Sequence, residues 1–459
     1  MKQQIPVKKG QTYEIDINTL GVSGEGVGRY EDFTVFVRGA LPGERARVRI
    51  EEVKKSYATG KMFELLRKSS DRVEPRCPIY EACGGCQLQH MQYEAQLKAK
   101  RQQVIDAMTR IGHQPDLYVE ETLGAESPWN YRNKMQFPIG TGKGGSQIKI
   151  GCYARASHDI IDTENCYIQR EANNELANAM RAAVKKLNIP VYDEDRHTGI
   201  LRHIVGRVGA KGELMAVIVT AKPKLPREKE LVQELRRKLP QLVSVHQNVQ
   251  TYRNNVIMGR DTKLLWGKPH IIDRLGALNF HISPRSFFQV NTKQAELLYG
   301  KTLEFAQLTG RETVIDAYCG TGTITLFLAQ KARQVYGIEI VKPAIQDAIK
   351  NARDNHIKNA EFIVGDATEV MPRLYREEIR PDVVVVDPPR AGCTETVLKT
   401  FADMQPQRIV YVSCNPATLA RDIDILKQFG FEAKKVQPID MFPNSSHVET
   451  VCFLSKYLL

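Results

Sequence analysis

The sequence predicts a multidomain α/β protein in which a small all-β barrel precedes a central α+β domain and a C-terminal doubly wound parallel sheet. Its 459 residues exceed the roughly 100–200 residues of one domain. Short alternating strand patterns fill the start of the chain, whereas the last third alternates Val- and Ile-rich runs with amphipathic stretches, as in parallel sheets covered by helices. We therefore expect domains at residues 1–66, 67–115, 116–279 and 280–459, the second being a cysteine segment with a linker helix.

The net charge of +12 is unevenly placed. Residues 280–459 hold 21 Lys and Arg against 21 Asp and Glu, which leaves 44 basic and 32 acidic residues in residues 1–279. A neutral module joined to a basic one is typical of chemistry joined to nucleic-acid binding, although a basic surface can also serve solubility alone. No stretch approaches the roughly 18 apolar residues of a membrane helix, and no apolar signal segment opens the sequence. We expect a cytoplasmic monomer without membrane contact.

The first 66 residues predict the barrel. Apolar and polar residues alternate at 13–17, 34–37 and 46–53, and glycines separate these runs. Short strands of this kind favour a small OB-like barrel, a fold that binds nucleic acid.

The cysteines that follow indicate a metal or cluster site. Without a signal segment the nine cysteines are not expected to form disulfides, because the cytosol keeps thiols reduced. Cys77, Cys83 and Cys86 are bunched, and clustered thiols bind zinc or iron–sulfur groups. Four thiolates are normally needed, so a distant cysteine must complete the set.

The central part of the chain mixes both kinds of element. Helices are predicted over 91–111 and 172–187, and strands over 148–153 and 214–219. Residues 201–207 form a basic strand-like segment. This mixture predicts an α+β domain.

The last third predicts a ligand site at the carboxyl ends of parallel strands. Strands are expected at 313–316, 334–339, 360–364, 382–387 and 408–413, with helices such as 342–355 between them. The first strand runs into Gly320-Thr321-Gly322, where glycines let a ligand approach a helix N-terminus. The third glycine of a dinucleotide fingerprint is missing, so this signal is weak by itself.

Three acidic residues strengthen the prediction of a ligand site at the strand ends. Glu339 closes the second strand 19 residues after Gly320, where an acid accepts the hydroxyls of a ribose. Asp366 follows the third strand, at the place of an adenine edge, and Asp387 ends the fourth. Together these signals favour S-adenosylmethionine over NAD as the ligand. The alternative without a ligand is that these acids only cap helices.

Cys414 and Glu449 are the candidate reactive groups. Cys414 lies between the fifth strand and Pro416, a good first residue of a helix, and a helix N-terminus favours the thiolate. A reactive cysteine on the same edge as a methyl donor suggests a covalent nucleophile, the alternative being a buried small apolar residue. Glu449 precedes the last strand and matters only if the sheet brings it beside Cys414.

These segments resemble the RNA uracil-5-methyltransferase family. The matching motifs are SFFQVN at 286–291, DAYCG at 316–320, GIE at 337–339, DPPR at 387–390, SCNP at 413–416 and HVE at 447–449. The resemblance implies a Rossmann-like class I methyltransferase domain at 280–459. It places Gln289, Tyr318, Thr323, Glu339, Asp366 and Asp387 around S-adenosylmethionine. It makes Cys414 the nucleophile, Glu449 the general base and Phe287 the aromatic residue that packs against the target base. Thr323 departs from the Asn that relatives often carry.

The same resemblance extends to the two upstream modules. It makes Cys166 the fourth ligand and a [4Fe-4S] cluster the second cofactor, with Cys152 as the competing ligand and zinc or an empty reduced site as alternatives. The barrel resembles a TRAM domain, an RNA-binding module, with GEGVGR at 24–29 in its early turn.

The function implied is methylation of C5 of a uridine in 23S rRNA. U747 and U1939, in the family's usual rRNA numbering, are the candidates, and one enzyme can serve both. The barrel and the cysteines point to this ribosomal branch. A tRNA T-loop uridine is the alternative substrate, and a non-catalytic RNA-binding protein is the alternative class.

Overall fold

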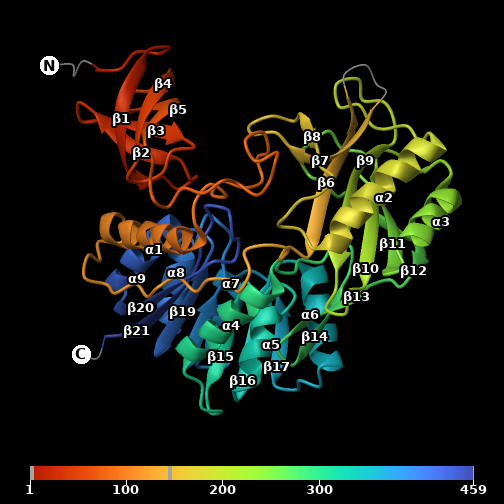
Figure 1. Ribbon diagram of the computed structural model, residues 1–459. Coiled ribbons are helices and arrows are strands. Elements are labelled where there is room, and N and C mark those ends of the chain that lie inside the picture. The colour runs from red at the N-terminus through yellow and green to blue at the C-terminus, as the bar shows by residue number, and fades with distance from the viewer. Residues whose placement is uncertain (1–4, 143–146, 458–459) are drawn as a thin grey trace.

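The computed structural model describes residues 5–142 and 147–457. Along the chain it forms a closed barrel, a cysteine segment, a seven-stranded sheet, a two-stranded sheet and a second seven-stranded sheet (Figure 1). Within the described residues, no helix combines the length and apolar character that crossing a membrane requires.

The barrel forms in the order β1-β2-β3-β5-β4. Its strands are β1 (Thr12–Leu20), β2 (Gly26–Tyr30), β3 (Phe33–Arg38), β4 (Arg45–Val53) and β5 (Tyr57–Arg67). Alternate residues such as Ile15, Val35 and Val48 point inward and are fully buried, as the period of two requires. A Cβ on Gly28 would lie 2.3 Å from the carbonyl oxygen of Asp16, so only glycine lets β2 approach β1 this closely.

The cysteine segment leads into α1 (Tyr93–Arg110), which packs on helix α9 (Pro416–Gln428) near the C-terminus. Val104 and Met108 of α1 are buried in the same apolar cluster as Ile423 of α9. Residues far apart in the chain therefore share one core, and α1 covers the C-terminal sheet while Ala95 near its start packs with Leu41 of the barrel.

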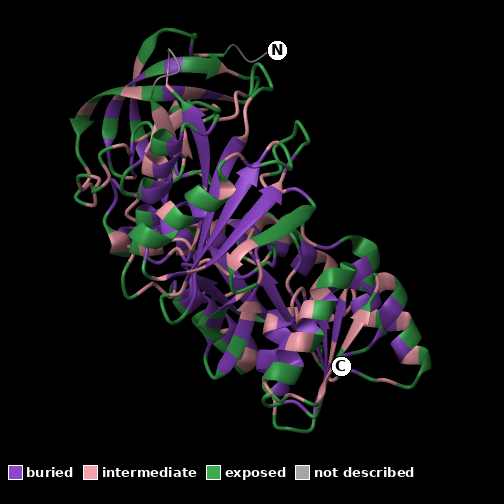
Figure 2. Cartoon of the chain, turned by 90° about the vertical axis from the view of Figure 1, so that its right-hand side faces the viewer, coloured by how far each residue is buried: buried purple, intermediate pink, exposed green. Residues whose placement is uncertain are grey.

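The central sheet has the order β12-β11-β10-β9-β6-β7-β8. Its strands are β6 (Lys134–Thr141), β7 (Ile148–Tyr153), β8 (Ile160–Asp162), β9 (Leu201–Val208), β10 (Leu214–Thr220), β11 (Leu242–Val249) and β12 (Asp261–Gly267). Helices α2 (Glu171–Leu187) and α3 (Glu228–Lys238) cover one face (Figure 1). Every residue of β9 and β10 is buried, and buried strands run through the middle of the molecule in Figure 2. The basic segment at 201–207 is thus an interior strand.

The C-terminal sheet has the order β17-β16-β15-β18-β19-β21-β20. Its strands are β15 (Thr313–Ala317), β16 (Gln334–Glu339), β17 (Ala360–Val364), β18 (Val383–Val386), β19 (Arg408–Ser413), β20 (Phe431–Ile439) and β21 (Glu449–Lys456). The hairpin β13 (Ile271–Leu275) and β14 (Leu278–Ile282) precedes it. The first five strands are parallel, and β21 runs antiparallel between β19 and β20.

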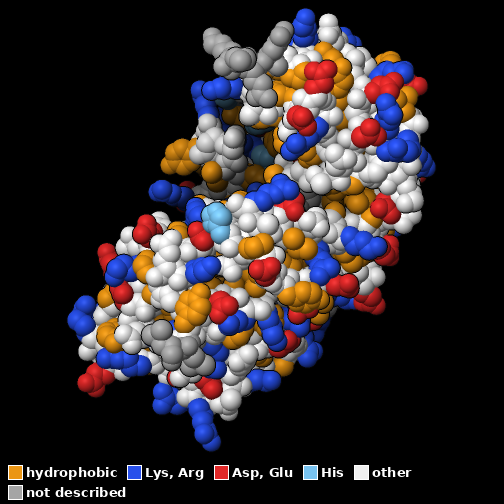
Figure 3. Space-filling model, turned by 90° about the vertical axis from the view of Figure 1, so that its left-hand side faces the viewer, with side chains coloured by type: hydrophobic (Ala, Val, Ile, Leu, Met, Phe, Trp, Pro, Cys, Tyr) orange, Lys and Arg blue, Asp and Glu red, His pale blue; other side chains and the backbone are white. Residues whose placement is uncertain are grey.

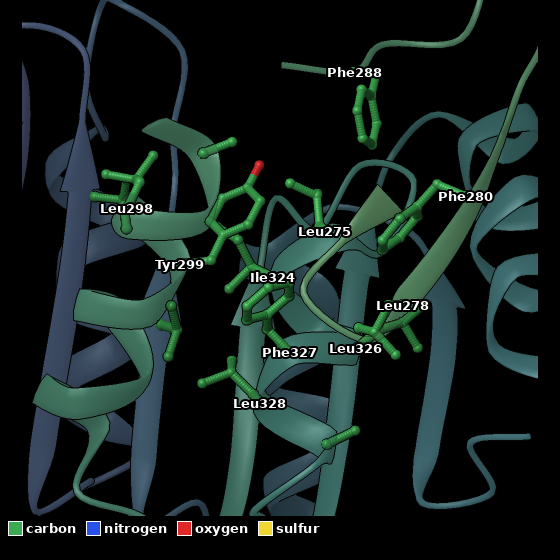
Figure 4. Packing of buried hydrophobic residues seen from close by; sticks show 14 of the residues in the cluster. Leu275, Leu278, Phe280, Phe288, Leu298, Tyr299, Ile324, Leu326, Phe327 and Leu328 are labelled. Carbon is green, nitrogen blue, oxygen red and sulfur yellow. The ribbon is translucent and has the colours of Figure 1, made fainter. Parts of the chain in front are cut away.

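Helices on both faces bury this sheet. They are α4 (Thr292–Ala306), α5 (Thr323–Ala329), α6 (Lys342–Asp354), α7 (Ala367–Arg376), α8 (Glu395–Asp403) and α9. Figure 4 shows part of the cluster where Tyr299 of α4 meets Phe327 of α5, with ring centroids 5.4 Å apart. The Val and Ile runs of the strands predict this double cover.

Candidate active site and cysteine cavity

The candidate active site lies at the carboxyl edge of the C-terminal sheet, where β15 has β16 on one side and β18 on the other. Such a switch in strand order is where doubly wound sheets bind ligands. Tyr318, the residue after β15, has a φ of +64°, a conformation that is strained for an aromatic residue. The turn continues through Gly322, whose added Cβ would lie 2.9 Å from the ring of Phe362.

Glu339 is tied to that turn. Its Oε2 accepts from the backbone N–H of Gly320 at 3.2 Å and its Oε1 accepts from that of Val341 at 2.9 Å. Each carboxylate oxygen has a second lone pair, so the residue can hold the loop and still accept from ribose hydroxyls. Ile340 beside it is 64% exposed, which leaves apolar surface for a flat ligand at this edge.

Asp366 caps a helix, which the sequence analysis gave as the alternative to ligand binding. It is the N-cap of α7, and its Oδ1 accepts from the backbone N–H and the hydroxyl of Thr368 at 2.8 and 2.6 Å. These bonds lower the pKa of the Asp366 carboxyl. The residue is exposed at the correct sheet edge, so capping does not prevent its other oxygen from meeting a ligand.

The register of β19 and β21 brings the two candidate reactive residues together. Ser413 pairs with Thr450 at the end of the antiparallel ladder. Continuing that register by one residue sets Cys414 opposite Glu449. The glutamate is 6% exposed and the cysteine is half-buried, and Asn415 caps the following helix by accepting from the N–H of Ala417.

Burial raises the pKa values of these groups in the free protein. It raises the pKa of Cys414 to about 11, with Glu449 and Asp387 adding to the rise and Arg390 opposing it. Burial, with Asp387 second, raises the pKa of Glu449 to about 8, and burial raises that of Asp387 to about 7. These shifts run opposite to the effect expected of the helix N-terminus on Cys414, and burial is their largest cause.

Tyr299 joins the site without having been predicted. Its hydroxyl lies 3.4 Å from Oγ1 of Thr323 and within hydrogen-bonding contact of Gln289. Burial raises the pKa of Tyr299, and Asp387 and Glu449 add to this rise. A tyrosine on the apolar face of a helix carries no sequence signal of such a role, although Figure 4 shows its hydroxyl at the edge of the packed cluster.

Phe287 stands out from a loop that is anchored in the central domain. Its side chain is 72% exposed, whereas Phe288 is buried. Asn133 donates from Nδ2 to the carbonyl oxygen of Gln289 at 3.0 Å, and Arg207 donates to that of Ser286 at 2.5 Å. An exposed aromatic ring on a fixed backbone is suited to packing against a base.

The five upstream cysteines line one cavity of about 590 Å³. They are Cys77, Cys83, Cys86, Cys152 and Cys166, and all are free thiols. Arg155 donates to the carbonyl oxygens of Cys83 and Cys86 at 3.2 and 2.8 Å, which fixes their backbone. The Cys152 thiol contacts both Cys83 and Cys166, so both candidates for the fourth ligand reach the cavity.

The thiols of this cavity are the candidate ligands of a metal group. Among the residues that the structure describes, no three His, Cys, Asp or Glu side chains converge closely enough to hold one ion. Zinc needs four ligands around one centre, whereas a four-iron cluster spreads its thiolates around a cube. The donor set, made of thiols with glycines beside them, is the set that iron–sulfur clusters use.

Family models match both ends of the protein. The model described as tRNA (Uracil-5-)-methyltransferase matches residues 225–457, and the TRAM domain model matches residues 6–63. The chain belongs to the RNA uracil-5-methyltransferase family. It is therefore an S-adenosylmethionine-dependent RNA methyltransferase with a TRAM barrel.

Similar proteins extend over the full length of this family member. A protein of Clostridium tetani described as an RNA methyltransferase is 50% identical over 458 residues, which is 100% of this chain and 99% of the relative. One of Halalkalibacterium halodurans, described in the same way, is 49% identical over 99% of both chains.

A solved structure bears on the choice of substrate. The Pyrococcus abyssi tRNA (uracil-54, C5)-methyltransferase, in complex with S-adenosyl-L-homocysteine, is 29% identical with a TM-score of 0.77, and the match covers 96% of this chain and 99% of that one. A tRNA enzyme thus aligns with nearly the whole chain.

Proposed function

We propose that the protein methylates C5 of a uridine in 23S rRNA. The observation that carries the reaction is the juxtaposition of Cys414, Glu449 and Asp387 at the donor edge of the sheet. The excess of basic residues in 1–279 supports an RNA substrate, and the family resemblance favours the ribosomal one. A tRNA uridine is the second candidate, because the Pyrococcus abyssi tRNA enzyme is similar over 96% of this chain.

The donor site would be formed by six residues of the C-terminal domain. Bound S-adenosylmethionine would supply an electrophilic methyl group. Glu339 would accept from its ribose and Asp366 would face its adenine. Tyr318 and Asp387 would line the space between them. Gln289 and Thr323, both in contact with Tyr299 of α4, would close the site from the loop before α4 and from the start of α5.

The protein side of the reaction follows from the chemistry of uracil, whose C5 is a weak nucleophile. The sulfur of Cys414 forms a bond to C6, and the electron pair of the C5–C6 double bond becomes an enolate. The enolate C5 would then form a bond to the methyl carbon of the donor while the methyl–sulfur bond breaks, its electron pair remaining on the sulfur of the departing S-adenosyl-L-homocysteine. Glu449 removes the C5 proton, the double bond re-forms, and the bond from C6 to sulfur breaks, which frees Cys414.

The ring of Phe287 would hold the target base over this cysteine. Its backbone is held by the contacts of Ser286 and Gln289 with the central domain. Binding of the base would therefore depend on both domains, although the bonds that change all lie at the C-terminal one.

Mapping of 5-methyluridine tests the substrate directly. Ribosomal and transfer RNA from a deletion strain and its parent are compared nucleotide by nucleotide. We expect one or both of U747 and U1939 to lose the methyl group in the deletion strain while tRNA keeps it. Loss of the methyl group from the tRNA T-loop alone would select the second candidate.

We also propose that Cys77, Cys83, Cys86 and Cys166 hold a [4Fe-4S] cluster. The cavity and its free thiols support this assignment. Protein purified without chelators should be brown and contain about four irons per chain. Cys166→Ser should lose the colour and the iron, whereas the matched variant Cys152→Ser should keep both. The reverse result would make Cys152 the fourth ligand.

A further inference from the structure

Three basic residues lie on one face of the central sheet, opposite the helices α2 and α3. Lys134 of β6 pairs with Arg207 of β9, and paired residues of neighbouring strands point to the same face. Arg132 precedes Lys134 by two residues, and its Nε donates to the carbonyl oxygen of Lys134 at 3.1 Å. Arg207 is 4% exposed, and the other two are half-buried. The group is therefore a small interior patch of positive charge.

No acid neutralises this patch. None of the salt bridges within the described residues involves Arg132, Lys134 or Arg207, and Nε of Arg207 is buried without a hydrogen-bond partner. Burial lowers the pKa of Lys134 to about 7, with the charges of Arg207 and Arg132 adding to this, and burial lowers the pKa of Arg207 to about 10.

Two other interior cations of the protein have carboxylate partners. Lys100 Nζ lies 2.5 Å from Oδ1 of Asp440, and Arg72 Nε lies 2.6 Å from Oε1 of Glu44. Buried Arg202 of β9 has none, but it stands apart from the patch and donates to the carbonyl oxygens of Gln250 and Tyr252. Burying several positive charges together without a partner is costly, so the grouping of three cations indicates an anion that arrives from outside the chain.

The patch adjoins the place where the target base would sit. Arg207 holds the carbonyl oxygen of Ser286, the residue before exposed Phe287. Asn133, which lies between two of the basic residues, holds the carbonyl oxygen of Gln289. An anion bound by the patch would therefore lie next to the loop that carries Phe287, on the side that faces the central sheet.

We propose that Arg132, Lys134 and Arg207 bind a backbone phosphate of the RNA next to the target uridine. The proposal rests on the proposed function, since it takes RNA to be the substrate. Guanidinium groups pair with phosphate through two hydrogen bonds, and an ammonium group adds a point charge. Binding there would couple the placement of the backbone to that of the Phe287 loop.

The test measures RNA affinity against salt for Lys134→Met, with Lys229→Met as the matched control. Lys229 is an exposed lysine of α3, on the covered face of the same sheet. The probe is a single-stranded oligouridylate of about 12 nucleotides, within the usual span of such sites. We expect Lys134→Met to lose about tenfold in affinity at low salt and about 0.7 from the slope of log K against log salt, the amount for one phosphate contact to a single strand. Lys229→Met and Lys134→Arg should keep the wild-type slope.

Two further results separate the explanations. Arg132 also lines the cysteine cavity, so the patch could instead balance the charge of thiolates. If Lys134→Met keeps the wild-type affinity and slope, the phosphate site is overturned, and loss of iron from that variant would assign the charge to the cysteines. If the wild-type protein itself shows no salt-dependent RNA binding, the proposed function has failed, which is a different outcome.

Discussion

Cys414 and Glu449 begin the cycle in an environment that opposes both of their ionised forms. The thiol has a pKa of about 11 and the carboxyl one of about 8, because burial and neighbouring carboxyl groups disfavour negative charge. A positively charged methyl donor bound at this edge would relieve that repulsion, since a nearby opposite charge favours the ionised form. Reactivity of the thiol would thus depend on the donor being present.

The separate roles of the two residues lead to different trapped states. Cys414→Ala should form no covalent RNA complex and transfer no methyl group. Glu449→Gln should still add and still methylate but should fail to release, because the C5 proton stays in place. Loss of a general base costs about 10²–10⁴-fold in rate, enough for the adduct to accumulate. A denaturing gel with radiolabelled donor shows it, and a Glu449→Gln protein with wild-type turnover would leave the base unassigned.

The same glutamate makes stability depend on pH. The pKa of Glu449 is about 8 in the folded protein against 4.5 for a free glutamate carboxyl, so the unfolded chain releases the proton first. The destabilisation that follows is absent below pH 4.5, grows as pH rises between these values and is complete above pH 8. Glu449→Gln should therefore match wild type in acid and exceed it by on the order of 5 kcal/mol in alkaline buffer. Denaturant unfolding at both pH values measures this, with the exposed Glu361→Gln as control, and equal gains at both would contradict it.

The motifs of the sequence predict which residues form the site, but they do not predict which of these residues lie next to each other. Cys414, Glu339 and Asp387 follow strands that are easily recognised by their many Val and Ile residues. Because parallel strands end at the same edge of a sheet, the sequence predicts that these three residues lie at one edge. The encounter of Cys414 with Glu449 depends on an antiparallel register between β19 and β21, which no local pattern encodes. Tyr299 was missed because its apolar ring looks like core.

At the scale of elements, the segment that leads from β20 to Glu449 is held by α1. Oδ1 of Asp440 takes a bond from Lys100 at 2.5 Å, and Oδ2 takes one from Tyr93 at 2.9 Å. Asn444, further along, exchanges hydrogen bonds with Gln96. Helix α1 was predicted within one or two residues of its ends, yet its packing on α9 was not, because amphipathic periodicity names a buried face without naming its partner.

Breaking this anchor should destabilise the protein. Lys100→Met leaves the buried carboxylate of Asp440 without its cation, which typically costs about 3–5 kcal/mol in free energy of unfolding. Lys98→Met, an exposed neighbour on the same helix, should change it by less than about 0.5 kcal/mol. Chemical denaturation measures both. Replacing Lys100 and Asp440 together by apolar residues should recover much of the loss, and no recovery would mean that Lys100 acts by packing alone.

At the scale of the whole molecule, positive charge gathers away from the chemistry. Figure 3 shows Lys and Arg side chains around the hollow between the upper and lower parts of one face. On the barrel, Lys9, Arg49 and Lys61 surround Phe63, which is 75% exposed. The charge count predicted this division, since it needs no knowledge of the fold. It could not predict which faces carry the charge, because that depends on strand register such as the pairing of Arg49 with Lys61.

The barrel surface should contribute to RNA affinity in two separable ways. Changing Lys9, Arg49 and Lys61 together to Gln removes up to three phosphate contacts, so the slope of log K against log salt should fall by about 2. Phe63→Ala should weaken binding by about 1–3 kcal/mol while keeping the slope, because stacking on a base releases no counterions. Neither change should alter the affinity for S-adenosylmethionine, which calorimetry measures, since the donor edge lies in the other domain.

A Phe63→Ala protein with unchanged RNA affinity would show that this ring does not contact RNA. A triple variant with the wild-type slope would move the phosphate contacts of the molecule to the central sheet and the loops around the active site.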